Sequence, residues 1–333
     1  MSIRTFAILC CAIASAHAAM PQGCDDVPAS PPAATPRQPV FPPAQLEIRT
    51  PQPPTAFPIE GRNVLLYELH LHDYGAQTPP VRTVDIISDQ DKLLASISEA
   101  QLKSRMRQYG KDGTAVVFVC LAFDAGAVVP RGLRHRLLLG DGFADGPLIG
   151  TQTSRLKTLG APLAGDWTAD NGPGLDSHHR TGVFVAGGLA LNTRRYAIDW
   201  KKYRDGQSYQ GDPRDARSHL AYGADVLAVA DGIVVASRND MPDNVPRTEA
   251  GFTPAVPMTM DNLAGNFIVI DLAMASTRNT RTAAGQRQVK AGDRVRRGQP
   301  VAQVGISGDA RVPHCISRCR TASTSWRGKA CPM

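Results

Sequence analysis

Alternation of apolar and polar positions is clearest in the run VLLYELHLH at residues 64–72. A period of two divides the side chains of this run between two faces. The first face is apolar and consists of Leu65, Tyr67, Leu69 and Leu71. The second face is mainly polar and consists of Leu66, Glu68, His70 and His72. The pattern predicts a strand that packs one face into a core.

Two further patterns lie in the same half of the chain. Residues 114–123 are almost continuously apolar, which is typical of a buried strand. Residues 92–109 carry apolar side chains at helical spacing, at Leu93, Ile97, Leu102 and Met106. Together these patterns predict a small β-rich domain over residues 59–146.

The second half of the chain has short apolar runs separated by turn residues. Asp231–Gly232 lies between two such runs, and this pair is typical of a two-residue hairpin because the turn needs positive φ. The segment 297–299, RGQ, separates two further runs in the same way. No marked helical period follows Val183. We expect a mainly β fold here.

The N-terminal end has the pattern of an export signal. Arg4 precedes an apolar run, and Ala16-His17-Ala18 fits the small-residue cleavage pattern. The apolar run is too short to span a bilayer, so we expect a secreted or periplasmic protein without stable membrane insertion. Residues 19–58 are rich in proline and predict an extended linker.

The cysteine count and the net charge do not point to a particular class of protein or partner. Residues 1–18 contain two of the seven cysteines, and the odd number that remains argues against a disulfide framework. The formal net charge of +7 first suggests an anionic partner. However, segments 274–288 and 315–333 carry seven Lys or Arg and no acidic residue, so their removal leaves no net charge. We therefore expect no nucleic-acid partner.

Four stretches of the last third occur in a characteristic order. They are RYAIDW at 195–200, YGADVLAVADGIVV at 222–235, VKAGDRVRRGQPVA at 289–302, and VGISG at 304–308 followed by VPH at 312–314. In this order they resemble the catalytic domain of the lysostaphin-type zinc metallopeptidases, secreted bacterial enzymes that cut peptide bonds of the cell wall. The resemblance implies an antiparallel, barrel-like sandwich, the duplicated hybrid motif, over residues 147–314. It also implies Zn²⁺ as cofactor and peptidoglycan peptides as partners.

The resemblance assigns roles to individual residues. Asp199 matches the metal-ligating Asp of the family's His-x3-Asp motif, and His314 matches the first His of its His-x-His motif, which acts as acid and base. Arg195 stands where the first ligand His belongs, and Ile316 stands where the third ligand belongs. Arg195 cannot bind zinc because its guanidinium has no acceptor.

A substitute ligand lies about twenty residues upstream of Asp199. His178 and His179 occur in the polar segment DSHHR, and either imidazole could complete a site with Asp199. The alternative is that both are solvated loop residues. His70 and His72 also form a His-x-His pattern, but no matching Asp motif accompanies them, so we expect a structural role. We expect His135 and His219 to lie on the surface.

Two segments depart from the family pattern in a common way. With suitable codons, restoring single nucleotides lets residues 315–333 be read as HLHF-containing sequence after His314, and lets residues 274–288 be read as a YAHL-containing run. We therefore predict that both segments are shifted reading frames and treat 315–333 as an aberrant tail. Two functions stay open: a zinc endopeptidase, impaired as written, or a degenerate domain that binds cell-wall material or activates another hydrolase. The sequence does not predict an oligomeric state.

Overall fold

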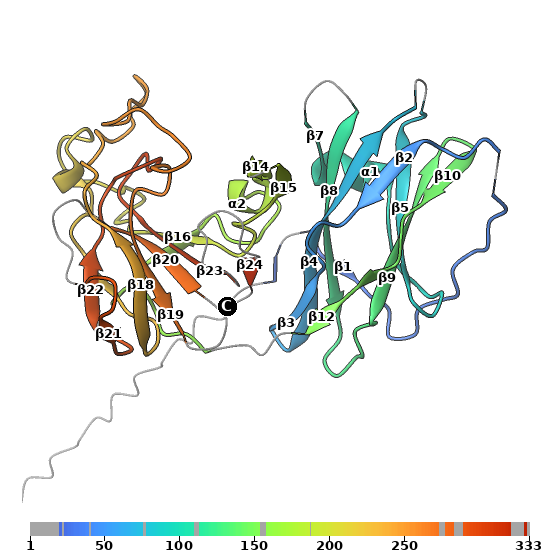
Figure 1. Cartoon of the computed structure of the whole chain (residues 1–333), viewed down its shortest axis with the longest axis horizontal. Helices are drawn as coiled ribbons and strands as arrows, with labels where there is room; N and C mark the ends of the chain where they lie inside the picture. Colours follow the sequence, from blue (N-terminus) through green and yellow to red (C-terminus); the bar gives the residue numbers. More distant parts are fainter. Residues whose placement is uncertain are drawn as a thin grey trace, which may run out of the picture.

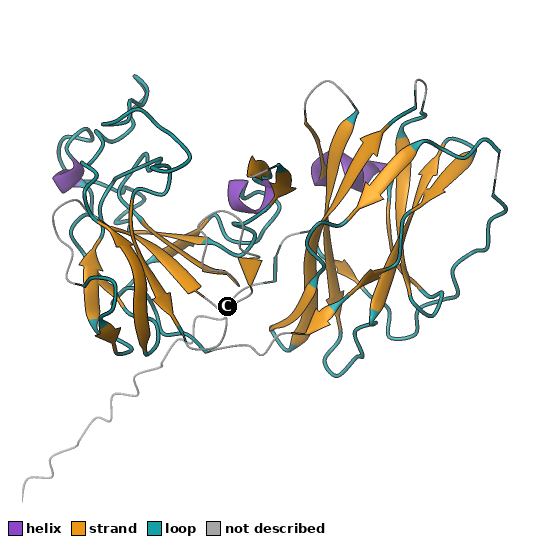
Figure 2. Ribbon diagram, in the orientation of Figure 1, coloured by secondary structure: helices purple, strands orange, loops and turns teal. Residues whose placement is uncertain are grey.

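A computed structural model describes residues 20–21, 23–39, 41–75, 78–109, 113–153, 158–186, 188–272, 277–282, 289–320 and 330–331. The chain forms two units of β-structure, one blue to green and one mainly yellow to red in Figure 1. Helices are few and short in both (Figure 2). The mainly β fold predicted from the sequence is confirmed. The predicted export signal at residues 1–18 lies outside the described residues.

The N-terminal unit is a sandwich of two sheets. The larger sheet contains β1 (Asp25–Asp26), β2 (Leu46–Arg49), β3 (Thr55–Ile59), β4 (Arg62–Asp73), β7 (Met106–Tyr109), β8 (Thr114–Phe123) and β12 (Gln152–Thr153). Its order is β1-β8-β4-β3-β12, with β2 on β4 and β7 on β8. The smaller sheet contains β5 (Val81–Ser88), β6 (Leu93–Ile97), β9 (Gly132–Leu139), β10 (Gly142–Asp145) and β11 (Ile149–Gly150). Its order is β10-β9-β5-β6, with β11 on β9.

The predicted division of β4 into two faces is confirmed. Its four apolar residues pack into the main core between the two sheets. Leu66, on the other face, belongs to a second apolar cluster that includes Tyr196 of the C-terminal unit. Glu68 lies on this second face and is buried. The second face of β4 therefore contacts the other unit.

Two expectations for the N-terminal half are wrong. Only α1 (Glu99–Arg105) is helical within 92–109, because Ser98 and Gln101 form a capping box that starts the helix there, while residues 93–97 pair with β5. Residues 19–58 are not simply an extended linker, since β1, β2 and β3 all join the larger sheet. Sheet pairing supplies the order that local composition does not predict.

A disulfide joins Cys24 to Cys120 on β8. The odd cysteine count had argued against a disulfide framework, and that expectation is wrong for this pair. The bond closes a loop of 96 residues and ties the segment before β1 to the larger sheet. Among the described residues, no helix is long and apolar enough to cross a membrane.

The C-terminal unit is built on an eight-stranded sheet. Its strands are β13 (Thr168–Asp170), β16 (Ile198–Lys201), β18 (Gly232–Arg238), β19 (Asn266–Asp271), β20 (Thr277–Thr282), β21 (Arg294–Val295), β23 (Cys315–Arg320) and β24 (Ala330–Cys331). The order is β13-β16-β23-β20-β19-β18-β21, with β24 on β23. Two small sheets pair β14 (Phe184–Ala186) with β15 (Leu189–Leu191), and β17 (Asp225–Leu227) with β22 (Pro300–Gln303). A helix, α2 (His178–Thr181), and a 3-10 turn at Ala216–Ser218 complete the unit.

The hairpin predicted at Asp231–Gly232 is wrong. The strands on either side of this pair join different sheets, because β17 pairs with β22 whereas β18 pairs with β19 and β21. Gly232 has a different function, since a Cβ there would lie 2.4 Å from the carbonyl oxygen of Asp271. The chain turns a corner here, and glycine allows two strands to approach closely.

The described parts of the two suspect segments are paired in the large sheet. β20 lies within 274–288 and pairs with β19 and β23. β23 begins at Cys315 and pairs with β16. The remaining residues of these segments, 274–276, 283–288, 321–329 and 332–333, lie outside the described residues. Both segments thus supply interior strands of the sheet, and the prediction of shifted frames stays a prediction.

A buried ion cluster joins the two units next to α2, which lies between them (Figure 1). Glu68 of β4 accepts hydrogen bonds from the guanidinium groups of Arg180 and Arg195, and we call these three residues the Glu68 cluster. Arg180 also donates to the carbonyl oxygens of Tyr67 and Val119, at 3.0 and 2.9 Å. The cluster attaches the segment that carries α2 to the N-terminal sheet.

Candidate metal centre

Asp199 lies on β16 and is 4% exposed. β13 pairs with this strand, and the residue after β13, Asn171, donates from its side chain to Oδ2 of Asp199 at 2.8 Å. This hydrogen bond orients the carboxylate, and Oδ1 faces the histidines described next. The sequence-predicted ligand therefore sits on a rigid element with its orientation fixed.

His179 comes from α2. Ser177 begins this helix by accepting a hydrogen bond from the backbone nitrogen of His179. The Nδ1 of His179 lies 3.3 Å from the carbonyl oxygen of Ala197. Because a carbonyl oxygen only accepts, this contact places the ring proton on Nδ1. The other nitrogen, Nε2, lies 3.5 Å from Oδ1 of Asp199.

His314 reaches the same carboxylate oxygen from the segment before β23. Its Nδ1 lies 2.7 Å from the carbonyl oxygen of Val312, so this ring also carries its proton on Nδ1 when neutral. Its Nε2 lies 3.5 Å from Oδ1 of Asp199. The residue is 7% exposed, so the contact is largely shielded from water.

His178 lies at the edge of the same group. The ligand atoms of His178, His179 and Asp199 lie within 4.8 Å of one another. The rings of the two histidines contact edge to face, with centroids 4.5 Å apart. His178 is exposed whereas His179 is 1% exposed. We call His178, His179, Asp199 and His314 the Asp199 cluster.

The donor atoms of the Asp199 cluster fit a zinc ion. Burial lowers the pKa of His179 to about 4, so its imidazole is neutral near pH 7. A neutral ring with its proton on Nδ1 directs a lone pair from Nε2, and the carboxylate also offers lone pairs. Acceptors that face each other repel unless a cation lies between them. Tetrahedral zinc with bonds of about 2.0–2.1 Å separates neighbouring donors by about 3.3–3.4 Å, close to the 3.5 Å between Nε2 of His179 and Oδ1 of Asp199.

The outer contacts of the cluster also match those of metal ligands. Histidines that bind metals usually donate the other ring nitrogen to a carbonyl or carboxylate. His179 and His314 both have such a carbonyl partner, and the carboxylate of Asp199 has Asn171. The cluster lines a cleft of about 510 Å³. A peptide therefore has space beside the group.

The two positions that departed from the family pattern lie in different surroundings. Arg195 is turned away from the Asp199 cluster and belongs to the Glu68 cluster. Ile316 pairs directly with Asp199 across β16 and β23, and its side chain lines the cleft. An imidazole at position 316 would therefore stand beside Asp199, whereas isoleucine offers no ligand atom.

The other four histidines among the described residues lie apart from the centre. His70 and His72 are on β4 of the N-terminal unit, and His72 contacts Thr114 at 2.9 Å. His135 and His219 are not surface residues, so that expectation is wrong. His135 is buried against the Tyr67 hydroxyl at 2.8 Å, and His219 contacts the Pro213 carbonyl at 3.0 Å. Each has a structural partner that local sequence does not indicate.

Sequence reasoning missed two residues of the site. Asn171, which orients Asp199, adopts a positive φ of 52° directly after β13. Asparagine tolerates this conformation, so a turn was the only available signal. Arg194 lines the cleft next to the arginine that the resemblance had singled out. Its neighbour Arg195 points to the Glu68 cluster, and nothing in the sequence distinguishes the two.

Comparison with known proteins gives structural matches alone. No protein-family model matches the chain, and no curated protein matches it. Solved structures that align include a point mutant of the catalytic domain of the prophage-encoded M23 protein EnpA from Enterococcus faecalis, at 18% identity and TM-score 0.29, covering 52% of this chain and 93% of that one. A putative peptidase M23 from Pseudomonas aeruginosa aligns at 12% identity and TM-score 0.30, covering 79% and 90%. A zinc-containing peptidase from Vibrio cholerae aligns at 14% identity and TM-score 0.28, covering 77% of each.

Proposed function

We propose that this protein is an exported zinc metalloendopeptidase that acts on the peptides of peptidoglycan. The observation that carries the proposal is the approach of two imidazole Nε2 atoms to one carboxylate oxygen, each at 3.5 Å. The motif order of the last third supports the reaction and the substrate. The Cys24–Cys120 disulfide supports an oxidising compartment, where such bonds persist.

His179 and Asp199 would hold the zinc ion, with His178 as the adjacent third donor. When bound, zinc acts as a Lewis acid and lowers the pKa of water towards neutrality. His314 is placed to accept the proton of the attacking water on Nε2, while the Val312 carbonyl fixes the ring through Nδ1. The resulting imidazolium would lie 3.5 Å from the carboxylate of Asp199, which stabilises its charge.

The same proton completes the reaction. Addition of water to the peptide carbonyl forms a new carbon–oxygen bond, and departure of the amine breaks the carbon–nitrogen bond. The amine needs a proton to leave, and His314 can return to it the proton that it accepted. Residues from α2, β16 and the segment before β23 all face the cleft, so water and peptide meet there.

Incubation with peptidoglycan tests the proposal. Protein loaded with one equivalent of zinc should release new amino groups from purified wall peptides, and a chelator should stop the release. Asp199→Asn should remove both zinc binding and cleavage while the far-ultraviolet circular dichroism spectrum stays unchanged. Zinc-loaded protein that releases no amino groups would contradict the proposal.

A second function is favoured by Ile316. Because this side chain faces Asp199 without a ligand atom, the chain as written has weaker means to hold zinc than a site with a third buried imidazole. We therefore keep a degenerate domain that binds wall material or activates another hydrolase as the alternative. It predicts that zinc-free protein co-sediments with peptidoglycan and that Asp199→Asn does not change this binding.

A further inference from the structure

The cleft beside the Asp199 cluster carries an excess of cationic side chains. Its lining includes Arg194, Lys201, Arg247 and Arg311, and only two carboxylates, Asp199 and Asp309. Lys201 already pairs with Asp170 at 3.0 Å, and Arg311 lies 4.0 Å from Asp309. Zinc would add further positive charge. A ligand with negative charge is therefore favoured over a neutral one.

Arg194 differs from the other cations of the cleft. It is partly buried, and its Nε is shielded from water without a hydrogen-bond partner among the described residues. Within that same part of the chain, no carboxylate lies within the 4.0 Å range of an ion pair with it. Burial lowers the pKa of Arg194, and the carboxylates of Asp309 and Asp199 act in the opposite direction. A guanidinium held in such surroundings loses solvation that its nearest protein partners do not fully replace.

The backbone fixes the direction of this side chain. The side-chain oxygen of Asn192 accepts a hydrogen bond from the backbone nitrogen of Arg194, at 3.0 Å. Arg195 then turns into the Glu68 cluster, whereas Arg194 faces the cleft. Adjacent arginines thus have separate tasks: one is neutralised by Glu68 and the other lines the site.

We propose that the cleft binds a peptide with a free carboxylate near the scissile bond, and that Arg194 binds this carboxylate. A guanidinium matches a carboxylate with two parallel hydrogen bonds, which gives orientation as well as affinity. Arg247 and Arg311 are exposed and would steer the anion towards the cleft. This inference rests on the endopeptidase function proposed above and specifies its substrate class.

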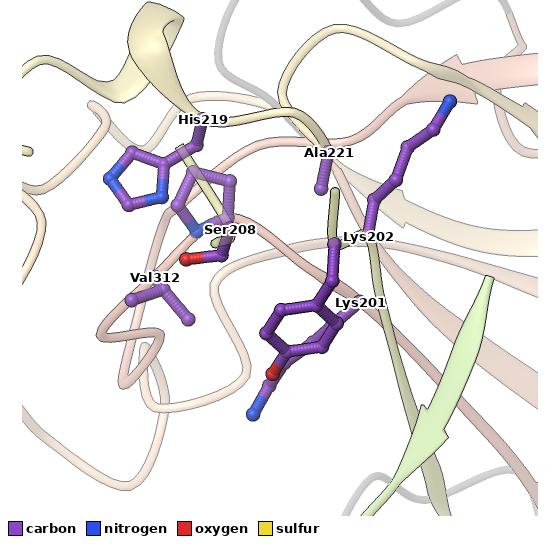
Figure 3. Close-up of a pocket in the computed structure, with 8 residues that line it drawn as sticks. Lys201, Lys202, Ser208, His219, Ala221 and Val312 are labelled. Carbon is purple, nitrogen blue, oxygen red and sulfur yellow. The ribbon is translucent and has the colours of Figure 1, made fainter. Parts of the chain in front are cut away.

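A second hollow adjoins the cleft and gives the peptide room to continue. It measures about 190 Å³ and shares Lys201 and Val312 with the cleft. Ser208, His219 and Val312 face the same space in Figure 3, whereas Lys202 extends away from them. Lys202 also lines the hollow, but its ammonium group lies 5.4 Å from the centre of the Trp167 ring, where a cation–π contact holds it.

Two peptides that differ at one group test the inference. Both have the same sequence, and one carries a free carboxylate beside the scissile bond where the other carries a carboxamide. Zinc-loaded wild type should cleave the carboxylate peptide with a kcat/KM about tenfold higher, because a hydrogen bond to a charged group is stronger than a neutral one by a free energy that corresponds to about this factor. Arg194→Gln should remove the preference by lowering kcat/KM for the carboxylate peptide alone, and Arg194→Lys should restore part of it.

Lys202→Gln is the matched control, because it removes a nearby positive charge that points away from the hollow. It should keep the preference within about twofold. Equal kcat/KM for the two peptides in wild type would overturn the inference. An equal loss of kcat/KM for both peptides in Arg194→Gln would also overturn the inference, because it would place Arg194 at the reacting carbonyl instead.

Calorimetry on metal-free protein separates this inference from the endopeptidase proposal. The carboxylate peptide should bind at least about tenfold more tightly than the carboxamide, and Arg194→Gln should abolish the difference. If neither peptide is cleaved but the affinities differ, the endopeptidase proposal fails and the carboxylate site stands. Equal affinities in wild type would overturn the carboxylate site even if both peptides are cleaved.

Discussion

Two buried carboxylates in this molecule have opposite surroundings. Glu68 is 3% exposed and lies between the guanidinium groups of Arg180 and Arg195. Asp199 is 4% exposed and lies beside the Nε2 atoms of His179 and His314. Guanidinium groups donate hydrogen bonds and always carry charge, whereas these imidazoles direct their protons to backbone carbonyls. The first carboxylate is paired with protein cations, and the second faces nitrogen atoms that could bind a cation together with it.

The Glu68 cluster and the Asp199 cluster have separate roles, although their residues are close in sequence. Arg180 directly follows His179, and Arg195 lies four residues before Asp199. Burial raises the pKa of Glu68, but the charges of Arg195 and Arg180 outweigh burial and hold this pKa below its usual range. The Glu68 cluster is therefore an ion triad at neutral pH. It fixes the segments on which the candidate metal ligands stand.

The largest expected effect follows from removing Glu68. Glu68→Ala leaves two buried guanidinium groups without their carboxylate, so the free energy of unfolding should fall by about 3–5 kcal/mol. Urea denaturation measures this change. Glu99→Ala is the matched control, because the Glu99–Arg82 pair is exposed and should contribute less than about 1 kcal/mol. A Glu68→Ala protein as stable as the control would show that the cluster is not structural.

Removing one imidazole from the Asp199 cluster should act on zinc instead of the fold. Changes in the outer contacts of zinc ligands cost about 10–100-fold in affinity, so loss of a ligand in His179→Ala should cost more than this. His178→Ala should lower zinc affinity by a smaller factor, because His178 is exposed and lies at the edge of the Asp199 cluster. Zinc titration with a competing chelator measures both. An equal loss in the two variants would contradict the ranking.

Adding an imidazole should have a smaller, opposite effect. Ile316→His places a ring directly across from Asp199, so zinc affinity should rise by at least about 10-fold, the lower end of what one outer contact of a zinc ligand contributes. Ile316→Phe is the control, because it introduces a ring without a ligand nitrogen. If the two variants bind zinc alike, position 316 does not face the metal.

Local pattern predicted part of this comparison. Alternation in residues 64–72 placed Glu68 on the second face of β4, because a strand has a period of two. It did not reveal the partners of Glu68, which lie 112 and 127 residues away in the sequence. The sequence also left His178 and His179 as alternatives, since adjacent loop residues look alike. Capping by Ser177 and burial distinguish them, and both depend on the folded chain.

Turn residues were a weaker guide. Asp231–Gly232 does mark a change of chain direction, but the hairpin prediction assumed that strands adjacent in sequence also pair. Partner choice depends on the whole sheet, in which β17 pairs with β22 much later in the chain. The same limitation explains why β1, β2 and β3 were not predicted. Their surroundings are rich in proline, and they pair with strands that are distant in sequence.

A last effect concerns the dependence of stability on pH. Burial lowers the pKa of both His179 and His135 to about 4, below the value of about 6.5 in unfolded chains. The unfolded state therefore binds more protons between these values, so stability is full above about pH 6.5 and is lost as pH falls towards 4. Each histidine contributes a slope of at most about 1.4 kcal/mol per pH unit. Urea denaturation of metal-free protein at several pH values from 4 to 7 measures this dependence of the free energy of unfolding. His135→Asn should remove the contribution of His135 to it. A flat profile would contradict the burial argument.

The position of a bound metal tests the central claim most directly. Crystals grown with zinc and measured at the zinc absorption edge should show an anomalous peak about 2.0–2.2 Å from both Nε2 of His179 and Oδ1 of Asp199. Crystals of Asp199→Asn, grown in the same way, should lack the peak. Absence of a peak at this position in the wild-type protein, or a peak bound elsewhere, would contradict the assignment of the Asp199 cluster as a metal centre.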